Sequence, residues 1–180
     1  MGAVRAGNVG LANSLGCGVA DDKAIYPYVP ALIRYYLGEE AILPNVDTYL
    51  LWEPDQCEAA LARLEKLVVK PVSASGGYGI VIGPQATAEQ LDICRKEIER
   101  DPRGWIAQEL VQLSSHPTLI DGKLEPRRID LRPFVLAGER IEVIPGGLTR
   151  VALRRGSYIV NSSQVGGSKD TWVLAAAEPS

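Results

Sequence analysis

The chain has 180 residues, a formal net charge of −3 at pH 7 and 46% hydrophobic residues, so it can bury a core as one domain or two small lobes. It has no block of Lys and Arg, and we therefore do not expect nucleic acid as its main partner. Three widely spaced cysteines and one histidine exclude a disulfide framework and a His-rich metal site. We expect a cytoplasmic protein without a membrane partner, because no apolar run reaches ~18 residues and no signal peptide is recognisable.

The opening of the chain predicts an irregular segment followed by a helix. Residues 1–20 are rich in glycine and small side chains, and we expect a loop and a short helix there; a frayed tail is the alternative. Asp21 and Asp22 are a candidate N-cap pair, Pro30 fits the first turn of a helix, and Gly38 fits its end. The apolar residues at helical spacing are predicted to face the core: Val29, Leu32, Ile33 and Tyr36.

Two amphipathic helices are predicted on either side of an apolar pair of strands. Residues 41–52 are expected to be extended, and the pattern from Pro54 to Lys66 predicts a helix that buries Cys57, Ala60, Leu61 and Leu64. A second helix is predicted over 87–101, because Thr87 and Gln90 have the spacing of a capping box. Its buried side would carry Leu91, Cys94 and Ile98.

Residues 67–82 are the most informative stretch of the sequence. Two short runs rich in Val and Ile predict paired strands, with Lys70 at the end of the first run. Gly76, Gly77 and Gly79 allow positive φ and a close approach of the backbone to a ligand. Exposed N–H groups in such a loop suit phosphate oxygens, and Lys70 would add a positive charge. We interpret this loop as a nucleotide triphosphate clamp; a hairpin that only bends a sheet is the alternative.

The second half of the chain predicts mainly antiparallel strands. We expect strands at 105–111 and 127–137, and the pair Asp121 and Gly122 predicts a tight turn between 118–120 and 123–124. A meander is predicted at 140–144, 148–153 and 158–160, with turns at 145–147 and 154–156. Residues 161–172 are polar and glycine-rich, and the tail 175–180 is expected to be disordered. The element order predicts an α+β fold with helices packed on mainly antiparallel sheets.

Polar residues recur on these predicted strands. Asp130 and Arg132 project to one face of a strand, because side chains alternate with a period of two. They would form an ion pair if buried together, or orient an anion if they lie beside a pocket, and Arg150 has the same two alternatives. Further polar residues come from other segments: Lys70, Gln108, Glu109, Asn161 and Lys169. The excess of positive charge in this set suits a triphosphate or a carboxylate substrate.

Five stretches in this order carry a resemblance to the ATP-grasp fold: residues 68–80, 106–111, 130–135, 149–152 and 161–168. Their order and spacing resemble carboxylate–amine ligases such as glutathione synthetase and the glutamate ligases that form peptide bonds. The stretches 5–9, 35–40 and 161–174 are similar to circularly permuted ATP-grasp proteins related to glutathionylspermidine synthase. The resemblance covers roughly residues 4–174, and it implies two small α+β lobes that clamp ATP.

The resemblance also implies roles for individual residues. Lys70 would contact the ATP phosphates, and the loop that closes over them would include Ser73, Ser75, Gly76, Gly77, Tyr78 and Gly79. The adenine would lie against Gln108, Glu109, Leu110 and Val111, with backbone groups reading its edge and Glu109 meeting the ribose. The phosphates and the acyl-phosphate intermediate would face Arg132, Arg150 and Asn161, with Lys169 as a further candidate.

In this family a substrate carboxylate attacks the γ-phosphate, and an amine then displaces phosphate, so we expect small-molecule or peptide carboxylate and amine substrates with ATP and Mg²⁺ as cofactors. The magnesium ligands depart from the family pattern: Glu142 begins a Glu-x-Asn pair with Asp130 upstream, but Ile144 cannot ligate a metal. The metal ligands are therefore unknown, and we expect them in an upstream part. On that view the chain alone is incomplete for catalysis.

The implied organisation has four parts. Residues 1–40 would be a lead-in that belongs to an absent upstream part, 41–111 the first lobe with the phosphate loop, 112–174 the second-lobe meander, and 175–180 the tail. A non-catalytic nucleotide-binding or scaffolding module is the main alternative, and a purely structural β-rich domain is a third. The apolar opening segment would favour a homo-oligomer.

Overall fold

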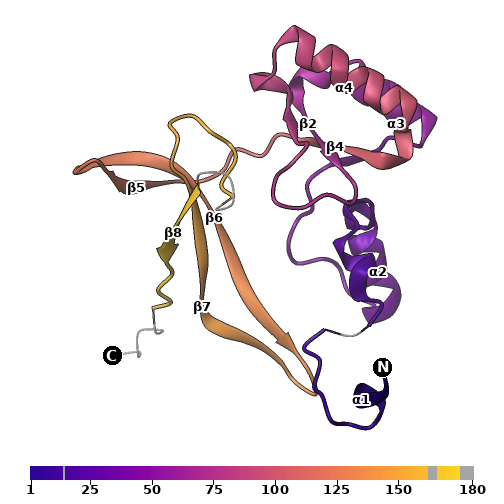
Figure 1. Cartoon of the computed structure of the whole chain (residues 1–180), viewed down its shortest axis with the longest axis vertical. Helices are drawn as coiled ribbons and strands as arrows, with labels where there is room; N and C mark the ends of the chain where they lie inside the picture. Colours follow the sequence, from indigo (N-terminus) through magenta and orange to yellow (C-terminus); the bar gives the residue numbers. More distant parts are fainter. Residues whose placement is uncertain (14, 162–165, 175–180) are drawn as a thin grey trace. The chain divides into compact units, whose positions relative to one another are not determined.

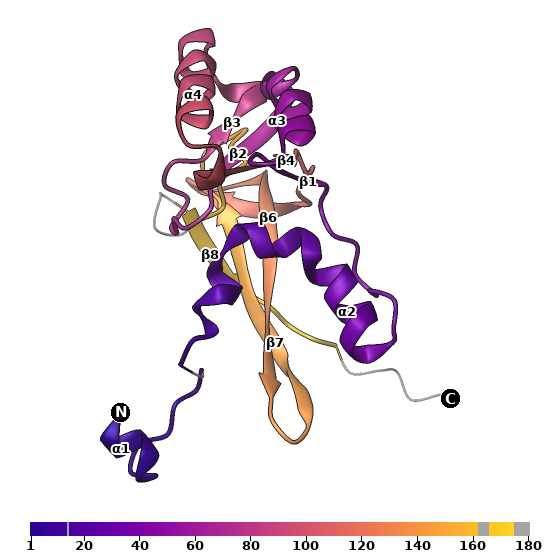
Figure 2. The ribbon, with the colours of Figure 1, turned by 90° about the vertical axis from the view of Figure 1, so that its right-hand side faces the viewer.

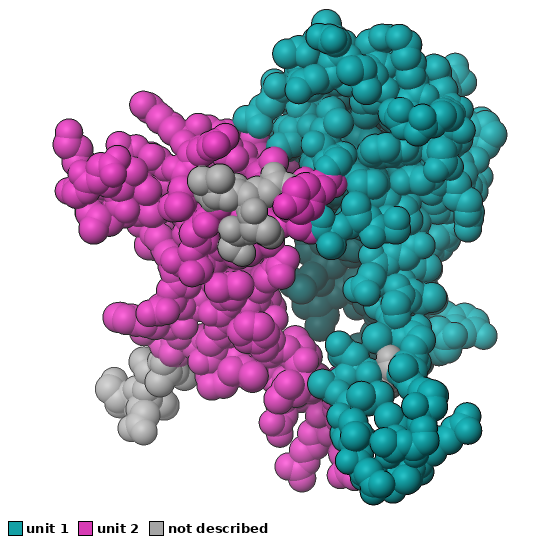
Figure 3. Space-filling view, in the orientation of Figure 1, with its two compact units in different colours: residues 1–75, 79–110 teal, residues 76–78, 111–180 magenta. Residues whose placement is uncertain are grey.

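The computed structural model describes residues 1–13, 15–161 and 166–174 (Figure 1). The chain forms two compact units: unit 1 contains residues 1–75 and 79–110, and unit 2 contains residues 76–78 and 111–180 (Figure 3). Helices and two four-stranded antiparallel sheets confirm the predicted α+β class. The prediction of a disordered tail at 175–180 lies outside the described residues.

Unit 1 is built on a sheet whose strands are β1 (Thr48–Leu50), β2 (Leu67–Pro71), β3 (Val81–Ile82) and β4 (Trp105–Glu109), in the order β1-β4-β2-β3. The predicted pairing across the glycine-rich loop is confirmed, because Val68 lies opposite Ile82 and Val69 opposite Val81. Both main helices, α3 (Pro54–Leu61) and α4 (Ala88–Arg100), lie on one face of this sheet (Figure 1 and Figure 2).

The main core of unit 1 fills the space between these helices and the sheet. Its buried residues are Leu51, Ala60, Leu64, Leu67, Val69, Cys94, Ile98 and Ala107, with Cys57, Leu61 and Leu91 packed against them. All of the residues that helical spacing predicted for the two helices are in this set. The predicted capping box of α4 is present, because Thr87 Oγ1 accepts from Gln90 N at 3.2 Å and Gln90 Oε1 accepts from Thr87 N at 2.8 Å.

The predicted helix over 54–66 is interrupted. The α-helix ends at Leu61, and a 3₁₀ turn, η3 (Leu64–Lys66), follows. The break lies at Arg63, whose φ is −137°, and the tighter turn that follows carries Leu64 into the core. The other short helices are α1 (Gly2–Arg5), η1 (Cys17–Asp21), η4 (Gly83–Gln85) and η5 (Pro102–Gly104).

Residues 22–28 contribute to the second face of the unit 1 sheet. The 3₁₀ helix η2 (Lys23–Tyr28) is capped by Asp22, whose carboxylate accepts from Ala24 N at 2.7 Å; this confirms the Asp22 cap. A smaller core of Ala24, Leu50 and Ile106 forms there, with Trp52 and Val72 packed against it.

The helix predicted around Pro30 exists, but its apolar side is not a core. It is α2 (Val29–Leu37), and Gly38 closes it with a φ of 67°. No residue of α2 is buried, and Leu32 and Tyr36 are 41% and 74% exposed. The prediction of a buried stripe is therefore wrong within the described residues, because this helix packs mainly against η2 and not against the sheet.

Unit 2 is a sheet of β5 (Ser115–Ile120), β6 (Lys123–Ala137), β7 (Ile141–Ala152) and β8 (Gly166–Asp170), paired in that order and antiparallel throughout. The long hairpin of β6 and β7 is its largest element (Figure 1). The tight turn predicted between β5 and β6 is confirmed, since Asp121 and Gly122 have φ values of 48° and 78°.

The predicted meander is wrong in two places. Residues 140–144 and 148–153 do not form two strands with a turn between them, because β7 runs through 145–147. A Cβ on Gly147 would lie 2.8 Å from the Arg132 carbonyl oxygen, so glycine there allows a close strand approach. Residues 158–160 form no strand. The second partner of β7, beside β6, is β8, which lies in the polar, glycine-rich segment 161–172.

None of the helices in the described segments combines the length and the apolar character needed to cross a bilayer.

Candidate functional site

The two faces of the unit 1 sheet have different characters. Ala107 belongs to the core under α3 and α4, whereas the neighbouring Ile106 belongs to the smaller core on the other face. Since side chains alternate along a strand, Gln108 projects to the same face as Ile106. Lys70 of β2 and Thr48 of β1 also meet Gln108 there. We call this surface the polar face, defined by Lys23, Thr48, Lys70 and Gln108.

A chain of hydrogen bonds fixes the Lys70 ammonium on the polar face. Lys70 Nζ donates to Gln108 Oε1, and Gln108 Nε2 donates to Thr48 Oγ1 at 2.8 Å. The Thr48 hydroxyl in turn donates to the Val46 carbonyl at 2.9 Å. Gln108 is buried, so its amide is held in one orientation, and the lysine at its carbonyl end has a defined position across three adjacent strands.

Lys70 is partly buried and has no ion pair among the described residues. Burial lowers the pKa of Lys70, and the positive charge of Lys23 lowers it further. In the described part of unit 1, no carboxylate forms an ion pair with this ammonium. An anionic ligand at this point would supply the missing counter-charge.

Lys23 provides a second cation that the sequence reasoning missed. Its ammonium donates to the Val72 carbonyl at 3.3 Å and to the Ala74 carbonyl, and its backbone N also donates to the Val72 carbonyl at 3.3 Å. Lys23 therefore holds the beginning of the glycine-rich loop. The signal in the sequence was the position of Lys23 directly after the Asp22 cap. Its two contacts, however, are with residues 49 and 51 positions further along the chain.

The glycine-rich loop has the backbone conformation that its sequence predicts. Gly76, Gly77 and Gly79 have φ values of 70°, 78° and 72°. At Gly79 a Cβ would also lie 3.1 Å from Pro71 Cγ, so a side chain there would strain the backbone and press on Pro71. Ser73, Ser75 and Tyr78 are exposed. Residues 76–78 group with unit 2, whereas the loop's flanking residues group with unit 1.

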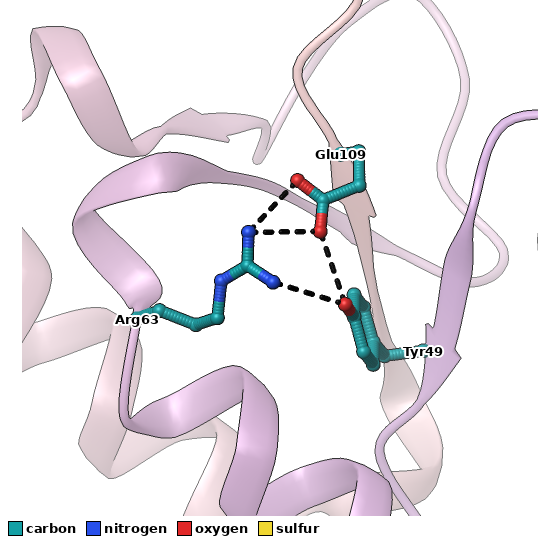
Figure 4. Close-up of polar contacts among 3 residues, drawn as sticks. All are labelled: Tyr49, Arg63 and Glu109. Carbon is teal, nitrogen blue, oxygen red and sulfur yellow. Dashed lines mark hydrogen bonds and ion pairs between the residues drawn. The ribbon is translucent and has the colours of Figure 1, made fainter.

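Glu109 is the last residue of β4, and because side chains alternate along a strand it lies on the opposite face from Gln108. Figure 4 shows its contacts with Tyr49 and Arg63. Its Oε1 accepts from Tyr49 Oη at 3.0 Å, and Arg63 Nη2 lies 3.0 Å from Oε1 and 3.1 Å from Oε2. Arg63 Nη1 also donates to Tyr49 Oη at 3.3 Å. The hydrogen bond to Glu109, together with burial, raises the pKa of Tyr49. The predicted ribose contact of Glu109 stays a prediction, and it would require this carboxylate to change partners.

The other two residues predicted to line the adenine, Leu110 and Val111, follow Glu109 directly. Leu110 is half-buried and closes the unit 1 part of the chain, and Val111, 46% exposed, opens the main part of unit 2. Neither belongs to β4, which ends at Glu109.

In unit 2 the structure brings Arg150 and Arg132 to one face of the sheet. Arg150 lies opposite Asp130 in the register and forms an ion pair with it, with Nε donating to Oδ1 at 2.8 Å and Nη2 contacting Oδ2. This hydrogen bond raises the pKa of Arg150. Arg132 is exposed, and no ion pair of its side chain is found among the described residues.

The remaining predicted residues of unit 2 lie elsewhere. Lys169 pairs with Thr149 in the register, so it lies on the other face from Arg150; its ammonium is 2.9 Å from His116 Nδ1 and donates to the Pro117 carbonyl. The Asn161 carbonyl accepts from Gly166 N at 3.1 Å. The rest of that motif, residues 162–165, lies outside the described residues.

No cluster of metal-binding side chains is found among the described residues. They contain no group of three or more His, Cys, Asp or Glu side chains that could hold a metal ion, and we assign no metal ligands. The polar face, in contrast, fits an anionic ligand, because it combines an uncompensated lysine with a glycine-rich loop.

Comparison with known proteins identifies the family of the chain. The family model described as Circularly permuted ATP-grasp type 2 matches residues 1–152. An uncharacterized protein of Mycobacterium tuberculosis (strain ATCC 25618 / H37Rv) is 56% identical over 174 residues, which are 96% of this chain and 32% of that protein. A Frankia alni protein named "Putative glutamate--cysteine ligase 2-3" is 56% identical over 171 residues, covering 95% of this chain and 20% of that protein.

An uncharacterized protein of Synechocystis sp. is 54% identical over 171 residues, which are 94% of this chain and 36% of that protein. The chain thus spans about a third of the length of the mycobacterial and cyanobacterial relatives. A closer relationship to glutathionylspermidine synthase stays a prediction. Because the family match extends over far more than half of its residues, the chain belongs to the circularly permuted ATP-grasp type 2 family.

Proposed function

We propose that the chain is the nucleotide-binding part of an ATP-dependent carboxylate–amine ligase. The observation that carries this proposal is the Lys70 ammonium, which is partly buried, fixed by Gln108 and without a carboxylate partner in the described part of unit 1. A phosphate group would provide that partner, and Lys23 would add a second positive charge at the base of the glycine-rich loop. Family membership supports ATP as the nucleotide.

The two ends of the nucleotide would meet different parts of the chain. Backbone N–H groups of residues 73–79, with Gly76, Gly77 and Gly79 in positive φ, would bind the phosphates together with Lys70. The backbone of Leu110 and Val111 would read the adenine edge. For unit 2, we propose that Arg132, Arg150 and Asn161 act on the transferring phosphoryl group, which is supported by the shared face of Arg132 and Arg150.

ATP would supply the phosphoryl group that converts a substrate carboxylate into an acyl phosphate, from which an amine then displaces phosphate. The residues of this chain would bind the phosphates, hold their charge and exclude water. The name of the Frankia alni relative favours substrates that carry an amino-acid carboxylate and an amine. All three cysteines have free thiols, which fits our proposal of a cytoplasmic location.

We also propose that this chain alone does not complete the reaction. The described residues provide no metal-binding cluster, and the chain spans only part of its relatives. A non-catalytic nucleotide-binding or scaffolding module is the second candidate, and the same lack of a metal cluster among the described residues favours it. Ligase turnover by this chain with ATP, magnesium, glutamate and cysteine would contradict both the proposed incompleteness and the second candidate.

Calorimetric titration with ATP tests the nucleotide site. Lys70→Met should weaken ATP binding about ten-fold or more, because a hydrogen bond to a charged group would be lost. Lys66→Met is the matched control, since Lys66 is an exposed lysine in η3 a few residues away, and it should leave the affinity unchanged. The proposal fails if the original chain does not bind ATP or if Lys70→Met binds it equally well.

A further inference from the structure

The carboxyl end of β4 is held from both faces of the sheet. Gln108 projects to the polar face and is bonded to Lys70 and Thr48. The next residue, Glu109, projects to the helix face and is bonded to Tyr49 and Arg63 (Figure 4). Two successive side chains thus tie the end of one strand to both of its neighbours.

The three residues on the helix face come from three separate elements. Tyr49 lies in β1, Arg63 lies between α3 and η3, and Glu109 ends β4. We call this set the Glu109 clamp: Tyr49, Arg63 and Glu109. Each member contacts the other two, so the carboxylate, the phenol and the guanidinium form a closed triangle.

The clamp lies where the ladder of backbone hydrogen bonds stops. The last pair of β2 and β4 in the register is Leu67 with Glu109, and Glu109 N donates to the Asp47 carbonyl at 3.0 Å. Beyond it come Leu110, which ends the unit 1 part of the chain, and Val111, which belongs to unit 2. The clamp therefore holds the end of β4 one residue before the unit 1 part of the chain ends.

The exposure of the Arg63–Glu109 ion pair indicates that the clamp positions elements and adds little to the stability of the fold. The Arg63 and Glu109 side chains are 41% and 33% exposed, and half-exposed ion pairs contribute little to the stability of a fold. Their geometry nevertheless joins three elements. In contrast, the exposed pair Lys96–Asp92 joins two residues of the single helix α4, so it positions no other element.

We propose that the Glu109 clamp is a positioning device that fixes the direction in which the chain leaves β4 at Leu110. Hinge positions are commonly a few residues at the ends of elements, and a rigid anchor beside them defines where bending begins. This inference rests on the proposed function in one respect: the backbone of Leu110 and Val111 is proposed to read the adenine. Glu109 is then a positioning residue, and nucleotide affinity depends on it through its neighbours.

Hydrogen–deuterium exchange of the ligand-free protein tests the clamp independently of any nucleotide. Arg63→Met and Glu109→Gln should speed exchange of the amide of residue 109, which donates to the Asp47 carbonyl at 3.0 Å, about ten-fold, with exchange in α4 unchanged, because only the anchor of the connection is loosened. Lys96→Met is the matched control, since it removes an ion pair of the same unit away from β4. Unchanged exchange of the residue 109 amide in both clamp variants would overturn the proposal, and so would faster exchange throughout unit 1.

ATP titration separates this inference from the proposed function. The clamp variants should bind ATP about three- to ten-fold more weakly, at thermal midpoints close to that of Lys96→Met. The reversed pair, Arg63→Glu with Glu109→Arg, should recover part of the affinity and of the slow exchange. Failure of the original chain to bind ATP would overturn the nucleotide proposal alone, because the exchange result still decides the clamp. Full ATP affinity in both clamp variants would overturn the positioning role.

Discussion

Lys70 shows how one side chain can be unfavourable for the fold and favourable for a ligand. Its ammonium is partly withdrawn from water and lies near a second lysine, Lys23, and both effects lower its pKa. Gln108 accepts one hydrogen bond from it, but an amide carries no charge to neutralise it. A binding site for phosphate has this character, because the cost of the charge is met when the anion arrives.

The first prediction at this scale concerns the dependence of stability on pH. Because the pKa of Lys70 is lower in the folded than in the unfolded protein, the unfolded chain binds more protons at pH values between the two. Stability from this residue therefore rises as pH increases through that window, by at most about 1.4 kcal/mol per pH unit. Urea unfolding of the protein and of Lys70→Met, from neutral pH to pH values near the ordinary pKa of lysine, measures this difference in slope. Identical slopes would contradict the lowered pKa.

Several residue-level contacts could not be predicted from the sequence. Lys70 and the three glycines stood out because they are close together in the chain. Lys23, Tyr49 and Arg63 did not, because their partners are contributed by strands and loops far along the sequence. Whether a charged residue is paired or unpaired depends on the strand register, and the register is set by long-range contacts.

Elements with local signals were predicted well. The capping box and helical period marked α4, and the β-branched runs marked β2 and β3, since these features depend on neighbouring residues only. The two errors in the strands of unit 2 involve glycine-rich segments. Glycines at 146 and 147 indicated a turn, but they lie within β7. The strand β8 contains no β-branched residue, so its sequence lacks the usual strand signal.

Glycine substitutions in β7 test this explanation. A Cβ at Gly147 would lie 2.8 Å from the Arg132 carbonyl oxygen, whereas a Cβ at Gly146 would lie no closer than 3.8 Å to the Thr171 carbonyl oxygen. Gly147→Ala should therefore lower the free energy of unfolding by about 2 kcal/mol, and Gly146→Ala should change it by about 0.5 kcal/mol or less. Urea unfolding measures both, and equal effects would contradict the close strand approach.

At the scale of the whole molecule, apolar side chains are unevenly distributed. The main core lies in unit 1 between α3, α4 and the sheet, whereas the apolar side of α2 is exposed. Helical period predicted an apolar face correctly in all three helices. It could not predict which of those faces meets a partner, because periodicity describes one element and burial depends on two.

Two isoleucines of α4 test where the core lies. Ile98 is 0% exposed and Ile93 is 54% exposed, although both are in the same helix. Ile98→Ala should lower the free energy of unfolding by about 2–5 kcal/mol, because it leaves a cavity. Ile93→Ala should cost about 0.5 kcal/mol or less. Urea denaturation of the two variants gives the comparison, and similar losses would show that this helix is packed differently.

The contacts of Lys23 have a consequence for the opening segment. The composition of residues 1–20 predicts an irregular segment. Just after it, Lys23 donates hydrogen bonds to the carbonyl groups of Val72 and Ala74, and its neighbour Ala24 is buried in the smaller core. Lys23 thus fixes the backbone at the start of the glycine-rich loop through these hydrogen bonds. A variant that begins at residue 29 would lack the hydrogen bonds from Lys23, although it would still contain every glycine of the loop.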